Sequence, residues 1–175
     1  MKAAWASAIR SVIVLVKEIT LRPVEGDDLA IFFEQQLDPV ANYMAAFTSE
    51  DSADREAFDA HWAKILGDDR TFNRTILLGR QVAGHIASFE RFGQPEIGYW
   101  LGKAFWGKGI ATQALALFLG EVTARPLYAR AVKDNLASIR VLEKCGFKVV
   151  GEDSGYAHAR GGDVEEYILK LEADE

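Results

Sequence analysis

Cysteine, histidine and long apolar runs are scarce in this sequence. The single cysteine, Cys145, excludes an intramolecular disulfide and a cysteine-based zinc site. The three histidines, His61, His85 and His158, do not have the spacing of metal ligands. No apolar run approaches the length of a membrane-spanning helix. We therefore expect neither a bound metal nor a membrane partner.

A surplus of positive charge is also lacking. The chain has 20 basic and 26 acidic residues, a formal net charge of -6, and its basic residues are scattered. Affinity for nucleic-acid phosphates needs clustered Lys and Arg, so a general nucleic-acid binder is excluded. An acidic surface instead suits a cationic or amine-bearing partner. The 175 residues, of which 49% are hydrophobic, are enough for one folded domain with a sizeable core.

The N-terminus is compositionally unusual. Alanine-rich sequence leads to Arg10 and the apolar run Val12–Val16, which faintly resembles a signal peptide. The run is too short for a typical signal peptide, and a Lys-Glu pair follows it without a small-residue cleavage site. We expect residues 1–17 to be an extension before a single domain at residues 18–175, and we expect a cytoplasmic location.

Apolar periodicity and turn residues predict a mixed α/β order of elements. Strands are predicted at residues 18–24, 72–78, 82–92, 96–101, 127–132, 147–151 and 165–171, and helices at about 26–36, 52–66, 109–121 and 135–144. Asp38-Pro39 is expected to break the helical pattern, and residues 40–51 are expected to be irregular. Short connections make the three middle strands an antiparallel meander. The helix that follows them forces the strands at 96–101 and 127–132 to run parallel. This order predicts a mixed sheet with helices on both sides.

A glycine-rich segment, Trp106–Thr112, lies between a predicted strand and a predicted helix. Its G-x-G-x-A spacing leaves no side chain between the backbone amides and an anion, and the first amides of the helix have no intrahelical partner. The segment therefore predicts a site for a pyrophosphate. The alternative is a turn that only reverses the chain.

Further motifs follow in a fixed order on the predicted elements. They are Glu96–Leu101, Trp106–Thr112, Asn135–Ser138 and Glu143–Phe147. Together they resemble the GNAT superfamily of acetyl-CoA-dependent N-acetyltransferases, and most of all its Rim-type branch, which acetylates the N-termini of ribosomal proteins. The resemblance covers about residues 18–171. It implies an α/β fold with a mixed, mostly antiparallel sheet, and acetyl-CoA as co-substrate with no metal.

The resemblance assigns the glycine-rich loop to the CoA pyrophosphate. Backbone amides of the loop would surround it, at Gly107, Gly109, Ile110, Ala111 and Thr112. Trp106 stands where the family often has Gln or Arg, and the Rim-type branch often shows this tryptophan. Lys108 would pair with a phosphate, although a solvated lysine is an equally good interpretation.

The resemblance also assigns the strand that ends at Leu101. In the family this strand splays from its parallel neighbour and leaves backbone groups for the pantetheine arm. A backbone N–H of Trp100 or Leu101 would stabilise the thioester oxygen as negative charge develops. The side chains of Tyr99 and Trp100 are expected to be core and rim aromatics.

The resemblance assigns roles in cofactor binding and acid catalysis to two residues at the start of the helix predicted at 135–144. Asn135 would bind the pantetheine, and Ser138 would lie near the sulfur. The same residues are also typical of a plain helix N-terminus. Leu142 replaces a tyrosine that protonates the thiolate in many family members, which leaves Ser138, or water, as the candidate acid.

For the catalytic base, Glu96 is the first candidate, because it is in phase with Gly98 and Trp100 on the cofactor strand. Glu90 and His85 are weaker candidates. Cys145, at a helix end, is expected to be a buried small hydrophobe rather than a nucleophile.

These observations predict an N-acetyltransferase in which a primary amine attacks acetyl-CoA directly in a ternary complex. The acceptor is a peptide or ribosomal-protein N-terminus or a small amine, in a cleft that Phe47, Trp62, Tyr156 and His158 would shape.

A non-catalytic acyl-CoA-binding module is the alternative function. A kinase-like or dinucleotide fold is disfavoured, because the loop lacks a lysine-serine pair and follows a meander. We also hypothesise that the protein forms a homodimer.

Overall fold

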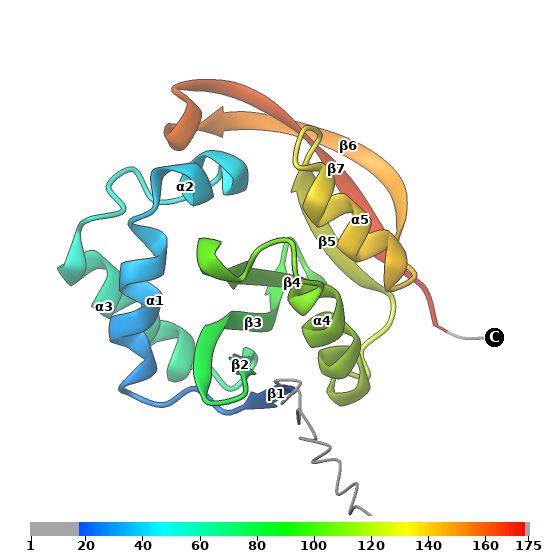
Figure 1. The fold of residues 1–175 in the computed structure, drawn as a ribbon. Helices are drawn as coiled ribbons and strands as arrows, with labels where there is room; N and C mark the ends of the chain where they lie inside the picture. Colours follow the sequence, from blue (N-terminus) through cyan, green and yellow to red (C-terminus); the bar gives the residue numbers. More distant parts are fainter. Residues whose placement is uncertain (1–17, 174–175) are drawn as a thin grey trace, which may run out of the picture.

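A sheet of seven strands runs through the molecule, and helices lie against both of its faces (Figure 1). The computed structural model describes residues 18–173, so the extension expected at 1–17 lies outside the described residues. The strands are β1 (Ile19–Arg22), β2 (Phe72–Leu78), β3 (Gln81–Arg91), β4 (Gln94–Leu101), β5 (Leu127–Val132), β6 (Lys148–Ala157) and β7 (Gly162–Leu171). The helices are α1 (Asp28–Gln36), α2 (Pro39–Ala45), α3 (Arg55–Leu66), α4 (Ile110–Glu121) and α5 (Leu136–Lys144), with short 3-10 turns η1 (Lys103–Phe105) and η2 (His158–Arg160).

The strand order confirms the expected mixed, mostly antiparallel sheet. It is β1-β2-β3-β4-β5-β7-β6, and every neighbouring pair is antiparallel except β4 and β5. The parallel pair follows from the crossover through α4, as predicted. Its register joins Glu96 to Tyr128 and Ile97 to Ala129, and no further pair is formed between these two strands. Beyond Ile97 the strands separate.

Neighbouring residues of β3 show how the sheet divides two cores. Ile86 faces the larger core, which it shares with Ile97 and the buried side of α4. His85 points to the other face, where its ring lies 4.7 Å from that of Phe32 and 4.9 Å from that of Trp62. The helices α4 and α5 therefore cover one face, and α1 and α3 cover the other. Helices on both sides of the sheet were predicted, but not which helices lie on which face.

The structure corrects the prediction that residues 40–51 are irregular. Pro39–Ala45 form α2, and the Asp38 carboxylate accepts hydrogen bonds from the backbone N–H groups of Val40 and Ala41, at 2.8 and 3.0 Å. Proline is well suited to the first turn of a helix, and aspartate is a strong N-cap. The Asp-Pro pair that predicts a break therefore begins a helix.

The last two strands are longer than predicted. They form a hairpin in which β6 pairs with β7 from Lys148 to Ala157. Most β6 side chains are exposed, because β6 is the edge strand of the sheet. A strand of this kind lacks the apolar alternation that reveals a half-buried strand.

Within residues 18–173, no helix combines the length and the apolar character needed to cross a membrane.

Candidate functional site

A groove of about 570 Å³ follows the gap between β4 and β5. Its walls come from α2, β4, the glycine-rich loop, α4, β5, α5 and β7. Ten of the eleven expected cofactor residues line this groove, on both sides of the gap. Those that line it are Trp100, Leu101, Trp106, Gly107, Gly109, Ile110, Ala111, Thr112, Asn135 and Ser138.

The backbone of β4 faces the gap at Leu101. The N–H of Gly102 donates to the carbonyl of Ala83 at 2.9 Å, which continues the antiparallel ladder with β3. In an antiparallel ladder, successive residues of a strand direct their backbone N–H and C=O groups alternately toward the partner strand and away from it. Leu101 directs these groups away from β3, because its carbonyl accepts a hydrogen bond from the Trp106 indole at 2.9 Å rather than from β3. The Leu101 N–H is therefore directed toward the side from which β5 has separated.

The glycine-rich loop forms an open cradle at the start of α4. Gly107 and Gly109 have φ values of 69° and 73°, which side chains resist, and a Cβ placed on Gly107 would meet no atom within 4 Å. Gly109 is the N-cap and offers no side-chain hydrogen bond to the helix. The first turn thus presents free backbone N–H groups, which is the arrangement that binds phosphates at helix N-termini.

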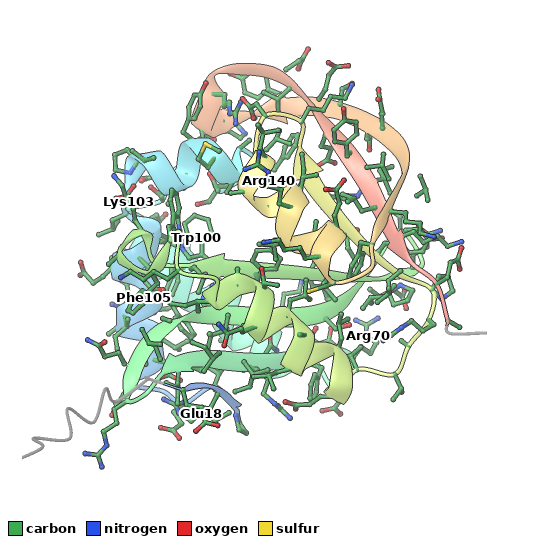
Figure 2. All side chains as sticks on the ribbon, turned by 45° about the vertical axis from the view of Figure 1, so that its right-hand side comes forward. Glu18, Arg70, Trp100, Lys103, Phe105 and Arg140 are labelled. Carbon is green, nitrogen blue, oxygen red and sulfur yellow. The ribbon has the colours of Figure 1, made fainter. Side chains whose placement is uncertain are left out.

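Lys108 takes no part in lining the groove. Its Nζ donates to the carbonyl of Ala104 at 2.7 Å, and the side chain is exposed. Two other basic residues, Arg140 and Lys144, were not predicted as part of the site, although they lie one turn apart on α5 and line the groove. Figure 2 labels Arg140 on α5, and Trp100 of β4 on the opposite wall. Their i,i+4 spacing on a predicted helix places both basic side chains on one face, and this was the signal in the sequence that could have identified them.

Asn135 is the N-cap of α5, as the alternative interpretation of this motif predicts. Its Oδ1 accepts from the Ser138 N–H at 3.2 Å, and its Nδ2 donates to the carbonyl of Met44 at 3.1 Å. The side chain therefore ties the start of α5 to α2. A single N–H of the Asn135 amide is left to reach a ligand.

Ser138 has a partner that the sequence did not reveal. The Tyr99 hydroxyl of β4 lies 2.8 Å from the Ser138 Oγ. Burial raises the pKa of Tyr99 to about 12, so the phenol stays neutral over the physiological range. Leu142, at the position of the family tyrosine, is 1% exposed within the core.

Glu96 is a buried member of an ion cluster beside the groove and does not line the groove. Its carboxylate is 3.4 Å from Arg91 Nη1 and 3.4 Å from Arg130 Nε. Burial raises the pKa of Glu96, although the two guanidinium groups act in the opposite direction. The carboxylate that does line the groove is Glu166 of β7, whose Oε1 accepts from Arg130 Nη1 at 2.8 Å. No local sequence signal marks Glu166, because its place depends on β7 pairing with β5.

The weaker candidates lie apart from the groove. His85 is enclosed by aromatic rings, and burial lowers its pKa to about 4. Glu90 is an exposed residue of β3. Cys145 packs against the core, where burial raises the pKa of the thiol and its Sγ lies 3.6 Å from the Thr112 carbonyl oxygen. That environment suits a packed hydrophobe rather than a nucleophile.

The residues expected to shape the acceptor cleft are not among the lining residues of the groove. Trp62 is buried in the aromatic cluster of α1 and α3. Phe47 packs close to Gly155, and the rings of Tyr156 and His158 meet edge to face at the end of the β6–β7 hairpin. In the described part of the chain, no group of three or more side chains of metal-ligand type is placed to hold a metal ion.

Comparisons of the chain with known proteins identify acetyltransferases. A family model described as "Acetyltransferase (GNAT) domain" matches residues 18–148. The chain is 26% identical over 166 residues to the "Uncharacterized N-acetyltransferase p20" of Bacillus licheniformis, a match that covers 89% of this chain and 93% of that protein.

Two solved structures share the fold. RimJ of Mycobacterium smegmatis, in complex with CoA-disulfide, has a TM-score of 0.75 at 23% identity, over 89% of this chain and 82% of that chain. Spermidine N-acetyltransferase of Vibrio cholerae, in complex with CoA and spermine, has a TM-score of 0.75 at 15% identity, over 88% and 95% of the two chains. The family model spans most of the domain and includes both the splayed strand and the glycine cradle. The chain belongs to the GNAT family and is an acetyl-CoA-dependent acetyltransferase, as its motifs predict.

Proposed function

We propose that this protein moves an acetyl group from acetyl-CoA directly to a primary amine, which is a peptide N-terminus or a small amine, within one ternary complex. The amine nitrogen forms a bond to the carbonyl carbon, and the bond from that carbon to sulfur breaks. Of the two protons that the ammonium form of the acceptor loses, one leaves to solvent and one ends on the sulfur. The protein contributes mainly by holding the reactants and by backbone hydrogen bonds.

The donor is held by residues that fit a phosphorylated ligand. The cradle at Gly107 and Gly109 has free N–H groups and open space where a side chain would otherwise project. Arg140 and Lys144 add positive charge to the same groove. The pantetheine arm of bound CoA would lie along the splayed end of β4, in the manner of an added strand.

The Leu101 N–H supports the thioester oxygen in this proposal. It points into the gap, where charge develops on that oxygen as the amine attacks. Ser138, fixed by Asn135 and Tyr99, gives its hydroxyl proton to the departing sulfur and recovers one from solvent. Because a thiolate leaves readily near neutral pH, this proton is an aid rather than a requirement. Glu96 does not line the groove, so in this proposal the acceptor proton leaves to solvent and is not taken directly by this carboxylate.

The single observation that carries the proposal is the continuity of one groove from the cradle to the splayed strand. A ligand that is anchored by phosphate at one end and extended at the other fits both parts. A folded domain with no such ligand has no evident reason to leave β4 unpaired beyond Ile97.

Calorimetry with CoA, followed by release of free thiol from acetyl-CoA in the presence of an amine panel, tests the proposal. We expect binding of CoA and amine-dependent release of thiol. Binding without turnover on any amine supports the acyl-CoA-binding module and contradicts the enzyme.

Sedimentation of the full chain and of a chain that lacks residues 1–17 tests the homodimer hypothesis. Monomeric behaviour of both chains contradicts it.

A further inference from the structure

The acceptor side of the groove can be identified from strand register. Glu96 pairs with Tyr128, so Trp100 and Arg130 turn their side chains to the same face of the sheet, the face that α2 covers. Val132 pairs with Glu166, which places that carboxylate on this face as well. The cradle and α5 belong to the opposite face. We call the α2-side part of the groove the acceptor half.

The acceptor half has an apolar roof. The side chains of α2 that line the groove are Ala41, Met44 and Ala45, and Val132 continues this apolar surface on the sheet. Glu166 is the only carboxylate among the described residues that line the groove. The other charged lining residues are all basic, namely Arg130, Arg140 and Lys144.

Glu166 is held in place by its neighbours. Arg130 Nη1 lies 2.8 Å from both Glu166 Oε1 and Asp153 Oδ2, and Arg130 also contacts Glu96 at 3.4 Å. Arg91 is the second guanidinium of this cluster and pairs with Glu96. Three carboxylates thus share two guanidinium groups, which leaves an excess of one negative charge. The side chains of Glu96, Glu166 and Arg130 are largely buried, whereas Arg91 and Asp153 lie at the exposed edge of the cluster. Buried charge of this kind favours the arrival of one cation.

We propose that the acceptor is a primary amine that carries a single positive charge next to an apolar group. Its ammonium binds at Glu166, and its apolar group lies under α2. This inference rests on the proposed function and narrows its acceptor class.

A polyamine does not fit the acceptor half in the same way. After one ammonium has taken Glu166, the others would lie against Ala41, Met44 and Ala45 or near Arg130. An ammonium buried without a carboxylate loses its hydration and gains nothing in return. Polyamines are therefore poor acceptors for this site.

An acceptor panel tests the proposal through kcat/KM, measured as thiol release. The panel is a tripeptide amide with N-terminal alanine, pentylamine and spermidine, so that its first two arms distinguish a peptide from a small amine as the source of the same chemistry. We expect one of the singly charged amines to exceed spermidine in kcat/KM by about tenfold or more, because burial of one unpaired ammonium costs at least about 1.4 kcal/mol. Transfer that is led by spermidine overturns this inference alone. Absence of transfer to every amine, with CoA bound, overturns the proposed function first.

Glu166→Gln tests the anchor. We expect the KM of the preferred amine to rise about tenfold, while the Kd for CoA is unchanged. Glu165→Gln is the matched control, because Glu165 is the next residue of β7, points to the other face and pairs with Lys133. Equal KM values for the two variants contradict the assignment of Glu166.

Met44→Glu tests the same proposal without disturbing the ion cluster. It adds a carboxylate to the apolar roof, and the backbone carbonyl that Asn135 holds is retained. We expect kcat/KM for spermidine to rise relative to that for the singly charged amine. If this ratio does not change, the roof does not select the acceptor and the proposal fails.

Discussion

The hydroxyl of Tyr99 and the Oγ of Ser138 lie 2.8 Å apart on the wall of the groove, although 39 positions separate them in the chain. Tyr99 extends from the part of β4 that has separated from β5, and Ser138 belongs to the first turn of the helix that Asn135 caps. Because the pKa of Tyr99 is raised to about 12, its neutral hydroxyl can donate to Ser138 and leave the serine proton for another acceptor. The pair orients the candidate acid.

Removal of the Tyr99 hydroxyl tests this orientation. We expect Tyr99→Phe to lower kcat by about three- to tenfold, the effect of one neutral hydrogen bond, with little change in the KM for acetyl-CoA. Ser138→Ala should lower kcat at least as much, and the double variant should be no worse than Ser138→Ala, because both changes remove one function. Tyr167→Phe, away from the groove, is the control. Additive losses in the double variant contradict a shared role.

The cradle at Gly107 can be tested against another glycine of the same geometry. Gly107 and Gly93 both have positive φ, and a Cβ on either would meet no atom within 4 Å. Leucine should therefore strain both sites equally, by about 1–2 kcal/mol, and lower both melting temperatures alike. Only Gly107→Leu projects into the groove, so we expect calorimetry to show a Kd for CoA at least tenfold higher for this variant. An unchanged Kd rules out the cradle as the phosphate site.

Glu96→Gln distinguishes a structural carboxylate from a catalytic base. The pKa of Glu96 is raised by burial, so its contribution to stability is present below the ordinary value of 4.5 and is lost as pH rises through the folded value. We therefore expect the stability of the variant, relative to the wild type, to increase with pH in denaturant titrations. The pH profile of kcat/KM should keep its acidic limb. Loss of that limb would identify Glu96 as the base.

His85 should make the fold sensitive to acid. Its pKa is lowered by burial to about 4 from an ordinary 6.5, so the neutral ring stabilises the fold above pH 6.5 and this stability is lost as pH falls from 6.5 toward 4. The full loss is about 3 kcal/mol. Denaturant titrations of His85→Phe should lack most of this slope, whereas His61→Gln, at the exposed His61, should retain it. A wild-type slope in His85→Phe contradicts the assignment.

The parallel pair of β4 and β5 was predictable, because a helix-length crossover permits only one strand direction. The cradle at Gly107 and Gly109 was also predictable, since its chemistry is contained in a single short segment. Glu166 was not, because it reaches the groove only through the neighbour relation of β5 and β7. The same limit explains Tyr99, whose partner Ser138 lies on a different element. The helix at Pro39–Ala45 was missed for a local reason, because proline was interpreted as a break where it begins a turn.

The short seam between β4 and β5 has a mechanical consequence. Two residue pairs, Glu96 with Tyr128 and Ile97 with Ala129, are the whole of the direct strand pairing that joins the β1–β4 portion of the sheet to the β5–β7 portion. A ligand that extends along the free end of β4 would contact both portions of the sheet and hold them together across this seam. We expect such a ligand to slow amide hydrogen exchange at Leu101 and at the facing residues of β5. Local opening of the sheet between β4 and β5 should therefore be rarer in the ligand-bound protein than in the ligand-free protein.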